Sequence, residues 1–581
     1  MTKRTIGDDR NLDIRCSIVF HSARRAWGLS RSDLHRQERS DPVTNVSRLF
    51  VRNSTGLVRE ASALDATIFN AAISAPVGST LAYSIFFTLV AFPGADVPSV
   101  LLLTVILNVP VLIMFALLAA SMPRVGGDYV WVSRILWPPL GLISNTAMIF
   151  GGLAGAAFFA KFFAVFALGP VLVALGTLTS NATLSSWGGS FTTDQTWILV
   201  ASLAIVVLQT VILIRGAKAT FRWQNGFFII AMAGTFVAFL VLLIGNRTDF
   251  IGHFNSLNQS FGGGTADDVI AAANAQTAAP DFGNLSATLP TMFAIQGFMM
   301  WNFWSVYMSG ELKSASNRGR QLSIMFGALF WDGILLILGA VLLFRLVGYN
   351  FVFALNTAPN AAYAIPSGPF YHFLAALVFN NPLLTLIIVG SFLFWSLPSM
   401  IANTFMPIRS FFAWSFDRLM PEKLSEVDER FHSPIPAILL ANVIIAGLLI
   451  WSVYSSQFQI LLGLIVEAGI LAVIIVALAA IAFPTRRPDL YRASPANVSV
   501  LGVPVLYITG VLSIIIFLVM LVISTQFPGL VMAGDPNNWW WIPAFFAAMI
   551  VIGLLIYYVP RFVRSREGVD VSLVYRELPP E

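Results

Sequence analysis

Charged residues are scarce in this chain of 581 residues. They make up 11% of it, against 57% hydrophobic residues and a mean hydropathy of +0.78. Because a soluble domain carries about 25% charged residues, the composition excludes a soluble globular protein and indicates one that crosses a membrane many times. The net charge of +5 does not indicate nucleic-acid binding, since the basic residues are spread over short loops and tails.

Cysteine is almost absent as well. The one cysteine, Cys16, lies in a polar, Arg-rich N-terminal stretch, which excludes an intrachain disulfide and a cysteine metal cluster. No cleavable signal peptide is visible in residues 1–60. We find no nucleophile triad, Walker loop or metal-ligand spacing, and the glycines at 262–264 are flanked by polar sequence rather than by a strand and a helix. The sequence therefore predicts neither an enzyme nor a bound cofactor.

Long apolar segments are what the sequence has in abundance. A helix needs about 20 apolar residues to cross a bilayer, and twelve segments are candidates. We therefore predict an all-α integral membrane protein with twelve transmembrane helices. The predicted spans are residues 61–92, 98–121, 135–176, 196–214, 219–245, 290–308, 321–346, 382–412, 434–453, 458–483, 503–524 and 539–559.

Basic residues orient these spans. Lys and Arg gather in cytoplasmic loops, and all but Lys161, Arg247 and Arg345 of the 34 fall on one side if the spans alternate. Both termini are thus predicted to be cytosolic, in a multi-pass protein of the plasma membrane. His253 and His372 fall in predicted outer loops and are expected to be surface residues. The expected parts are a partly disordered cytosolic tail (1–60), spans one to five (61–245), an extracytoplasmic loop (246–289), spans six to ten (290–483), spans eleven and twelve (484–560) and a cytosolic C-terminal tail (561–581).

The first predicted span is interrupted in its middle. Proline removes a backbone donor and clashes with the preceding turn, and nearby glycine and serine ease unwinding. Such a break at mid-membrane depth is tolerated where the freed backbone faces protein or a wet cavity. We therefore predict half of a transport site here, the alternative being a proline kink in a packing helix. The predicted binding residues are Ser74, Ala75, Pro76, Val77, Gly78 and Ser79.

The loop after the second span carries a recognisable motif. Residues 122–134 read MPRVGGDYVWVSR and resemble the Pro-x-x-Gly-Gly-x-Tyr segment of the amino acid–polyamine–organocation superfamily of permeases. Three further segments are similar to that family: GELK at 310–313, RSFFAWSFDRLMP at 409–421 and RRPDLYR at 486–492. The four segments occur in the family's order, and the resemblance covers most of the chain from about residue 57 to 510.

The resemblance implies a leucine-transporter-type fold. In that fold spans one to five and six to ten are inverted repeats with broken first and sixth helices, here followed by two C-terminal helices. The matching interruption in the sixth span would lie at Gln296, Gly297 and Phe298. This chain differs from many family members in the first span, where SAPVG at 74–78 replaces a Gly-x-Gly break.

Broken helices suit a zwitterion. A half-helix N-terminus carries roughly +0.5 charge and can hold a carboxylate, while free carbonyls face an ammonium group. No Asp or Glu lies beside either break, so a polycation has no counter-ion and neutral amino acids are favoured. Trp301 and Trp304, with Phe298 and Phe303, form either an apolar wall of the site or ordinary packing contacts.

Four residues are candidates for ion coupling. Asp332 and Glu467 lie about ten residues into their spans, near the midplane at 1.5 Å per residue. A carboxyl group there is costly and marks function, which suits proton coupling; the alternative is a protonated carboxyl bonded to a neighbouring helix. The resemblance implies that Ser396 and Ser399 supply oxygens to a sodium ion, although serines also pack between helices.

These observations predict a secondary transporter. It would move amino acids or related amines by alternating access through a lipid bilayer, coupled to protons or sodium or by exchange. One alternative is a non-transporting amino-acid sensor on the same fold. Another is a major-facilitator-type carrier, which usually has a long cytosolic loop between spans six and seven. That loop is short here (309–320), and the long loops follow spans five and seven.

Overall fold

Ten helices of this chain are long and apolar enough to cross a membrane, within the residues that the computed structural model describes. Those residues are 59–73, 78, 80–81, 85, 88–277, 281–455, 458–527 and 536–575. Apart from Glu567–Val569 they belong to one unit, residues 52–566 and 570–581. The ten spans are Val97–Ser121, Pro138–Leu178, Gln195–Ile214, Ala217–Ile244, Arg318–Leu346, Pro382–Phe416, Ile435–Tyr454, Gly463–Arg486, Val505–Gln526 and Trp541–Arg566.

The first and sixth predicted spans are not among these ten. Helix α3 (Ala63–Ile73) has 11 residues and ends directly before Ser74. Helix α14 (Leu285–Met299) has 15 residues, and the turn at residues 300–303 separates it from the short 3₁₀ helix η3 (Trp304–Met308). Neither helix alone has the roughly 20 residues that a bilayer requires.

Two of the long spans also change their backbone form on the way. The third region comprises α7 (Pro138–Phe162), a π-helical turn η2 (Phe163–Leu168) and α8 (Gly169–Leu178). The eighth comprises α18 (Pro382–Ser391), the 3₁₀ turn η4 (Phe392–Phe394) and α19 (Ser396–Phe416). The other spans are α5 (Val97–Ser121), α10 (Gln195–Ile214), α11 (Ala217–Ile244), α15 (Arg318–Leu346), α20 (Ile435–Tyr454), α21 (Phe458–Arg486), α23 (Val505–Gln526) and α25 (Trp541–Arg566).

The connecting segments are largely helical too. A capping box between Thr265 and Asp268 starts α13 in the segment after α11. The short elements are α4 (Thr88–Ala91), α6 (Asp128–Ile135), α9 (Ala182–Thr193), α12 (Arg247–Ser260), α13 (Ala266–Gln276), α16 (Tyr349–Thr357), α17 (Tyr371–Ala376), η5 (Glu422–Ser425), α22 (Pro488–Ala493), η6 (Pro536–Trp540), η7 (Val571–Tyr575) and the antiparallel pair β1 (Ser499–Val500) and β2 (Val503–Pro504).

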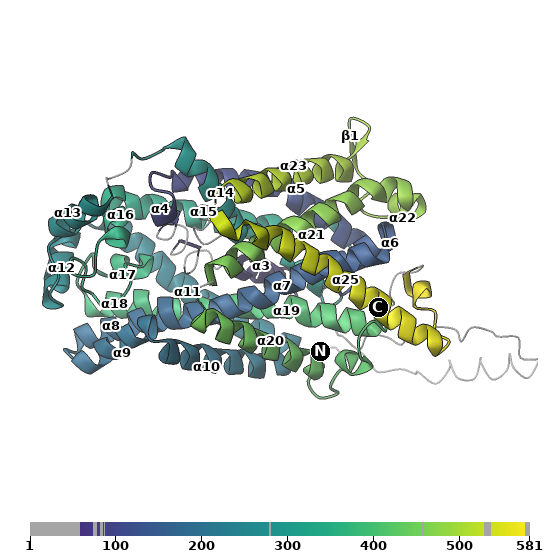
Figure 1. Cartoon of the computed structure of the whole chain (residues 1–581), viewed down its shortest axis with the longest axis horizontal. Coiled ribbons are helices and arrows are strands. Elements are labelled where there is room, and N and C mark those ends of the chain that lie inside the picture. Colours follow the sequence, from purple (N-terminus) through teal and green to yellow (C-terminus); the bar gives the residue numbers. More distant parts are fainter. Residues whose placement is uncertain are drawn as a thin grey trace, which may run out of the picture. The chain divides into compact units, whose positions relative to one another are not determined.

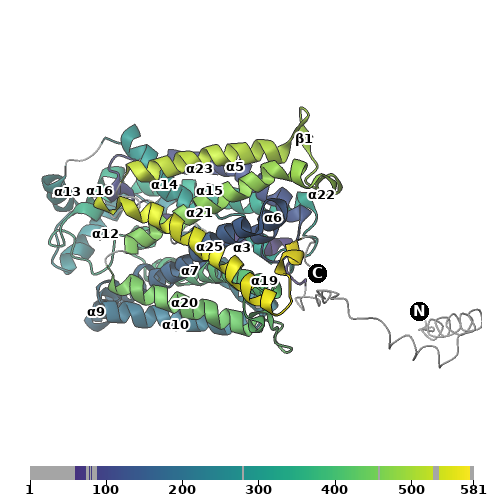
Figure 2. The ribbon, with the colours of Figure 1, turned by 45° about the vertical axis from the view of Figure 1, so that its right-hand side comes forward.

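The two long connections meet at one end of the helical unit. Figures 1 and 2 both show α12, α13 and α16 together there, with α6 and α22 at the opposite end. Asn258 ties the connections together, because its Nδ2 donates to Ala362 O at 2.7 Å and its Oδ1 accepts from Ala364 N at 2.9 Å. The expectation for His372 was wrong: it is fully buried and stacks on Phe392. His253 is half-buried against the carbonyl of Leu377.

The three basic residues predicted on the outer side all bind helix C-termini. Lys161 Nζ donates to Ser452 O at 2.8 Å, Arg345 to Leu243 O at 2.8 Å and Arg247 to Leu346 O at 3.2 Å. The last carbonyls of a helix lack intrahelical partners and carry partial negative charge. Each of the three basic residues that depart from the predicted cytoplasmic distribution therefore stabilises a helix C-terminus.

Helix α7 lies at the centre of the packing. It contacts α19, α20, α21 and α25. Its inner surface is rich in glycine and alanine, and residues 151–157 read GGLAGAA and are buried. Small residues let membrane helices approach closely. Of the helices packed on α7, α21 also packs against the interrupted helix α14, and α19 packs against η3, which follows it.

Candidate functional site

A cavity lies beside the ends of α3 and α14. Helices α7, α19 and α21 close its other sides. Aromatic rings dominate its wall, and none of the described residues that line it is charged. The lining residues are Ile73, Thr88, Phe92, Gly151, Gly155, Phe158, Phe159, Phe293, Ala294, Gly297, Phe298, Trp301, Trp304, Asn403, Gly463, Ile465 and Val466.

Two polar side chains reach this apolar wall. Thr88 is fully buried, and its Oγ1 makes no hydrogen bond to any described residue. Asn403 Nδ2 donates to Ser399 O at 2.9 Å, and its Oδ1 faces Gly155, where a Cβ would come within 2.4 Å. A buried hydroxyl without a partner costs free energy unless something else bonds to it. Thr88 is therefore available to a bound molecule.

The sixth-span interruption lies later than the sequence predicted. Gln296, Gly297 and Phe298 are still helical, and the chain turns at residues 300–303. Close packing explains the glycine at position 297 instead, because a Cβ there would lie 2.4 Å from Val466 Cγ2. Trp301 Nε1 donates to Gly297 O at 2.6 Å and so satisfies a carbonyl of the last turn. The prediction of an interruption is supported, but its position was wrong by a few residues.

A buried polar link joins the two interrupted spans. Asn70 of α3 donates through Nδ2 to Ser305 Oγ at 3.0 Å, and its Oδ1 accepts from Ser305 N at 2.7 Å. Asn302, in the turn before η3, donates to Asp332 Oδ2 at 2.6 Å. All four side chains are fully buried. Asp332 on α15 therefore bonds to the sixth-span turn, and Asn70 on α3 bonds to η3 directly after that turn.

The first-span site is only partly visible. Ser74, Ala75, Pro76, Val77 and Ser79 lie outside the described residues. Gly78 is buried against Trp395, the residue before α19, whose Cβ would lie 2.7 Å from a Cβ at position 78. Ile73, the last residue of α3, lines the cavity. The last residue of α3 thus borders the same cavity as Gly297, Phe298 and Trp301.

The comparison with known protein families agrees with this geometry. The chain matches the family described as amino acid permease over residues 66–555. That is more than half of its length. The chain belongs to the amino acid permease family. No curated protein matches it.

Membership in this family indicates the general class. The protein is a multi-pass membrane protein, and its family implies amino acid transport rather than an enzymatic activity. The resemblance drawn from the motif at 122–134 is confirmed. Gly126 and Gly127 of the motif have positive φ values of 102° and 49°, and a Cβ on Gly127 would come within 2.8 Å of Tyr307. The paired glycines are therefore required for the turn into α6.

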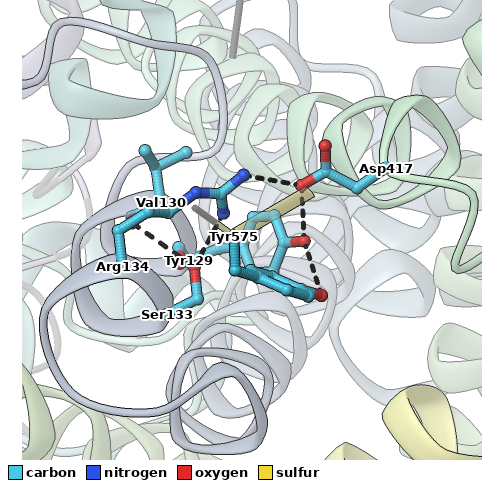
Figure 3. A network of polar contacts seen from close by, with 6 residues as sticks. All are labelled: Tyr129, Val130, Ser133, Arg134, Asp417 and Tyr575. Atoms are coloured by element: carbon cyan, nitrogen blue, oxygen red, sulfur yellow. Dashed lines mark hydrogen bonds and ion pairs between the residues drawn. The ribbon is translucent and has the colours of Figure 1, made fainter. Parts of the chain in front are cut away.

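The other motif segments of the permease gather around α6. Glu311 and Arg409 form a buried ion pair with two hydrogen bonds. Arg134 NH2 lies 2.9 Å from Asp417 Oδ2, with both side chains buried (Figure 3). Backbone bonds from Ala61 to the 311–313 segment bring the start of α3 to the same place. Sequence segments far apart in the chain thus form one polar layer at this end of the permease.

Asp128 is the best-connected carboxyl group of this layer. It accepts from Ser144 Oγ at 2.5 Å, Asn145 Nδ2 at 2.7 Å and the Tyr307 hydroxyl at 2.8 Å. Burial raises the pKa of Asp128 to about 6, and the hydrogen bonds from Ser144, Tyr307 and Asn145 offset part of this shift. The residue lies between two spans, so it is outside the membrane-spanning segments.

The four predicted coupling residues lie in two places. Ser399 Oγ donates to Ala72 O, in the last turn of α3, at 2.5 Å. Ser396 is buried one turn earlier, and its Oγ makes no hydrogen bond to the described residues. Asp332 binds Asn302, as described above. Glu467 is fully buried on α21 beside Ser524 of α23. Its neighbours along α21 contact the sixth span, because Val466 lies against Gly297 and Gly469 lies against Trp301.

Sequence reasoning missed several polar residues of the site. Asn70, Asn302 and Asn403 were not singled out, nor was Asn108, which forms a reciprocal amide pair with Gln296 at 3.0 and 3.3 Å. Gln296 therefore faces α5 and is not among the cavity-lining residues. An uncharged polar residue inside an apolar span is a usable signal, since such residues bond between helices. The spans contain many such polar residues, however, and the sequence does not show which of them bond to each other.

Proposed function

We propose that this permease is a secondary transporter of neutral amino acids that works by alternating access. The observation that carries the proposal is the cavity at the ends of α3 and α14. It adjoins two helices that stop within the span, and every described residue that lines it is uncharged. The sequence of residues 74–87 contains no charged residue either.

The proposed topology has twelve spans. Ten of them are the continuous helices, and the other two are the interrupted spans: α3 with the segment up to Phe92, and α14 with η3. Spans one to five and six to ten would form the inverted repeats, and α23 and α25 the two C-terminal helices. The basic loops then place both termini in the cytosol, with the α6 end of the permease inside and the α12 end outside.

The proposed substrate contacts follow from the backbone at the two interruptions. Residues 74–79 and the turn at 300–303 are the proposed contacts for the carboxylate and ammonium of an amino acid. Thr88 supplies one further hydroxyl. Phe158, Phe298 and Trp301 would surround the substrate side chain, which favours a large apolar one, because apolar surface removed from water supplies the binding energy.

Coupling is assigned to protons through Glu467 in preference to sodium. Glu467 is a buried carboxyl group with Ser524 as its polar neighbour, and residues on either side of it touch the sixth span. A buried carboxyl group of this kind is a candidate proton carrier. Ser396 and Ser399 remain the proposed oxygens for sodium, and transport in sodium-free buffer separates the two ions.

A transport screen tests the proposal. Purified permease in liposomes is offered labelled amino acids, polyamines and related amines, alone and with a pH or a sodium gradient. Uptake of neutral amino acids above protein-free liposomes is the expected result. A thermal shift with an amino acid but no uptake would identify a sensor, and uptake of polyamines alone would refute the assigned substrate class.

A further inference from the structure

The C-terminal segment packs into the polar layer around α6. Three residues of η7, Val571, Val574 and Tyr575, are buried although they follow the last membrane span. The Tyr575 hydroxyl is hydrogen-bonded to that of Tyr129 at 3.2 Å. The Arg134 guanidinium lies over the Tyr575 ring, 5.0 Å from its centroid. Figure 3 shows Tyr575 in contact with both partners.

Its partners belong to two different parts of the permease. Tyr129 and Arg134 lie on α6, between spans two and three, whereas Asp417 follows α19, the second part of span eight. Asp417 Oδ2 accepts from the Tyr129 hydroxyl at 2.7 Å and from Arg134 NH2 at 2.9 Å. Burial raises the pKa of both Tyr129 and Tyr575, so both phenols keep their protons. Tyr575 therefore packs against the Arg134–Asp417 ion pair, which connects α6 with the end of α19.

An unbroken series of contacts leads from the cavity to this residue. Trp304 lines the cavity, and its ring packs edge-on against Tyr307 at 5.4 Å. The Tyr307 hydroxyl donates to Asp128, which precedes Tyr129 on α6. Tyr129 in turn contacts Tyr575 at a ring distance of 6.4 Å. A path from the cavity to this face has to separate these groups, and Tyr575 is the outermost of them.

We propose that Tyr575 is a positioning residue of the cytoplasmic gate and that the C-terminal segment must leave α6 before the cavity opens to the inside. This proposal rests on the proposed function, because a cytoplasmic gate has a role only in a transporter. The segment stabilises the inward-closed state through one hydroxyl bond, one cation–π contact and ring packing. Loss of a single contact of this kind shifts a two-state population about three- to tenfold. Loss of all three therefore raises the inward-open population by about tenfold or more.

Alkylation of an introduced thiol measures this population directly. The background is Cys16→Ser, which leaves no native thiol in the chain, with Ser309→Cys as the reporter. Ser309 follows η3 and is fully buried, so a thiol there reacts only when this face opens. The rate at which the reporter thiol reacts with N-ethylmaleimide in liposomes, without any substrate, shows how often this face opens. Because no transport is measured, failure of the proposed substrate leaves this test intact.

Three variants give the comparison. Tyr575→Ala removes ring and hydroxyl, Tyr575→Phe removes only the hydroxyl, and Tyr507→Ala is the control on the exposed face of α23, where the ring is 48% exposed. We expect alkylation of the reporter thiol to accelerate about tenfold or more in Tyr575→Ala, less in Tyr575→Phe and not in Tyr507→Ala. The thermal unfolding temperature of each variant is recorded alongside.

Two results overturn the proposal. Unchanged alkylation in Tyr575→Ala would show that the gate does not depend on the C-terminal segment. An increase that appears equally in Tyr507→Ala, or only in proportion to a lowered unfolding temperature, would show that Tyr575 merely anchors the chain. Rescue by Tyr575→Phe distinguishes the ring contacts from the hydroxyl bond.

Discussion

Asn70 of α3 and Ser305 of η3 hold each other through two hydrogen bonds, although they stand 235 positions apart in the chain. The Asn70 amide donates to the Ser305 hydroxyl at 3.0 Å and accepts from the Ser305 backbone N–H at 2.7 Å. The amide thus serves as a partner for a backbone group that the interrupted span leaves free. This side chain therefore helps to join the two halves of the proposed site.

Loss of this amide is expected to damage both stability and transport. Asn70→Ala leaves the buried Ser305 N–H without its partner, which costs about 1–3 kcal/mol. Ser305→Ala removes only the hydroxyl and should cost less, because the backbone bond remains. Thermal unfolding in detergent and uptake in liposomes measure the two effects, with exposed Asn497→Ala as the control. An effect of Ser305→Ala equal to that of Asn70→Ala would contradict this assignment.

Gly151 offers a test of the substrate pocket. A Cβ at this position would stand 3.7 Å from Trp301 Cη2, an ordinary contact, so Gly151→Ala fits the fold but fills space inside the cavity. We expect it to weaken transport of large apolar amino acids about tenfold or more and to spare small ones. Gly447→Ala, on α20 with open space around it, is the matched control. Equal losses for large and small substrates would remove Gly151 from the pocket.

Glu467→Gln separates driven transport from exchange. The amide keeps the shape of the side chain but cannot carry a proton. Under proton coupling, uptake driven by a pH gradient should disappear while exchange of internal for external substrate continues. Exposed Glu426→Gln should change neither. Unaltered driven uptake in Glu467→Gln would exclude this residue as the proton carrier.

Asp128 predicts a pH-dependent stability with a defined sign. Burial raises its pKa to about 6 in the folded permease, above the ordinary value near 3.9, so the fold binds this proton more tightly than the unfolded chain does. Its stabilising contribution is complete below about pH 4 and is lost as the pH rises through about 6, a change of the order of 3 kcal/mol. Thermal unfolding of wild type compared with Asp128→Asn, from pH 4 to 8, measures it. A wild type that gains stability over Asp128→Asn on this interval would contradict the assignment.

The sequence predicted the architecture better than the details of the site. The motif at 122–134 identified the family. Helix α3 ends at Ile73, directly before the predicted break at 74–79, most of which lies outside the described residues. The sixth-span turn was placed too early because a glycine in a membrane helix signals either a break or a close contact, and Gly297 serves the contact with Val466. His372 was misplaced because loop length alone does not show that α17 packs inward. The pairing of Asn70 with Ser305 depends on tertiary structure that no local pattern contains.

Counterflow in liposomes tests the central claim most directly. Liposomes loaded with an unlabelled neutral amino acid of large side chain are placed in a trace of the same labelled compound, with wild type, Thr88→Val and Thr210→Val compared. Thr88 lines the cavity with a buried, unpaired hydroxyl, whereas Thr210 binds only a carbonyl of its own helix. We predict label accumulation by wild type and Thr210→Val, and by Thr88→Val an apparent affinity about three- to tenfold weaker. No accumulation by the wild type with any neutral amino acid, or equal affinities for all three proteins, would contradict the account.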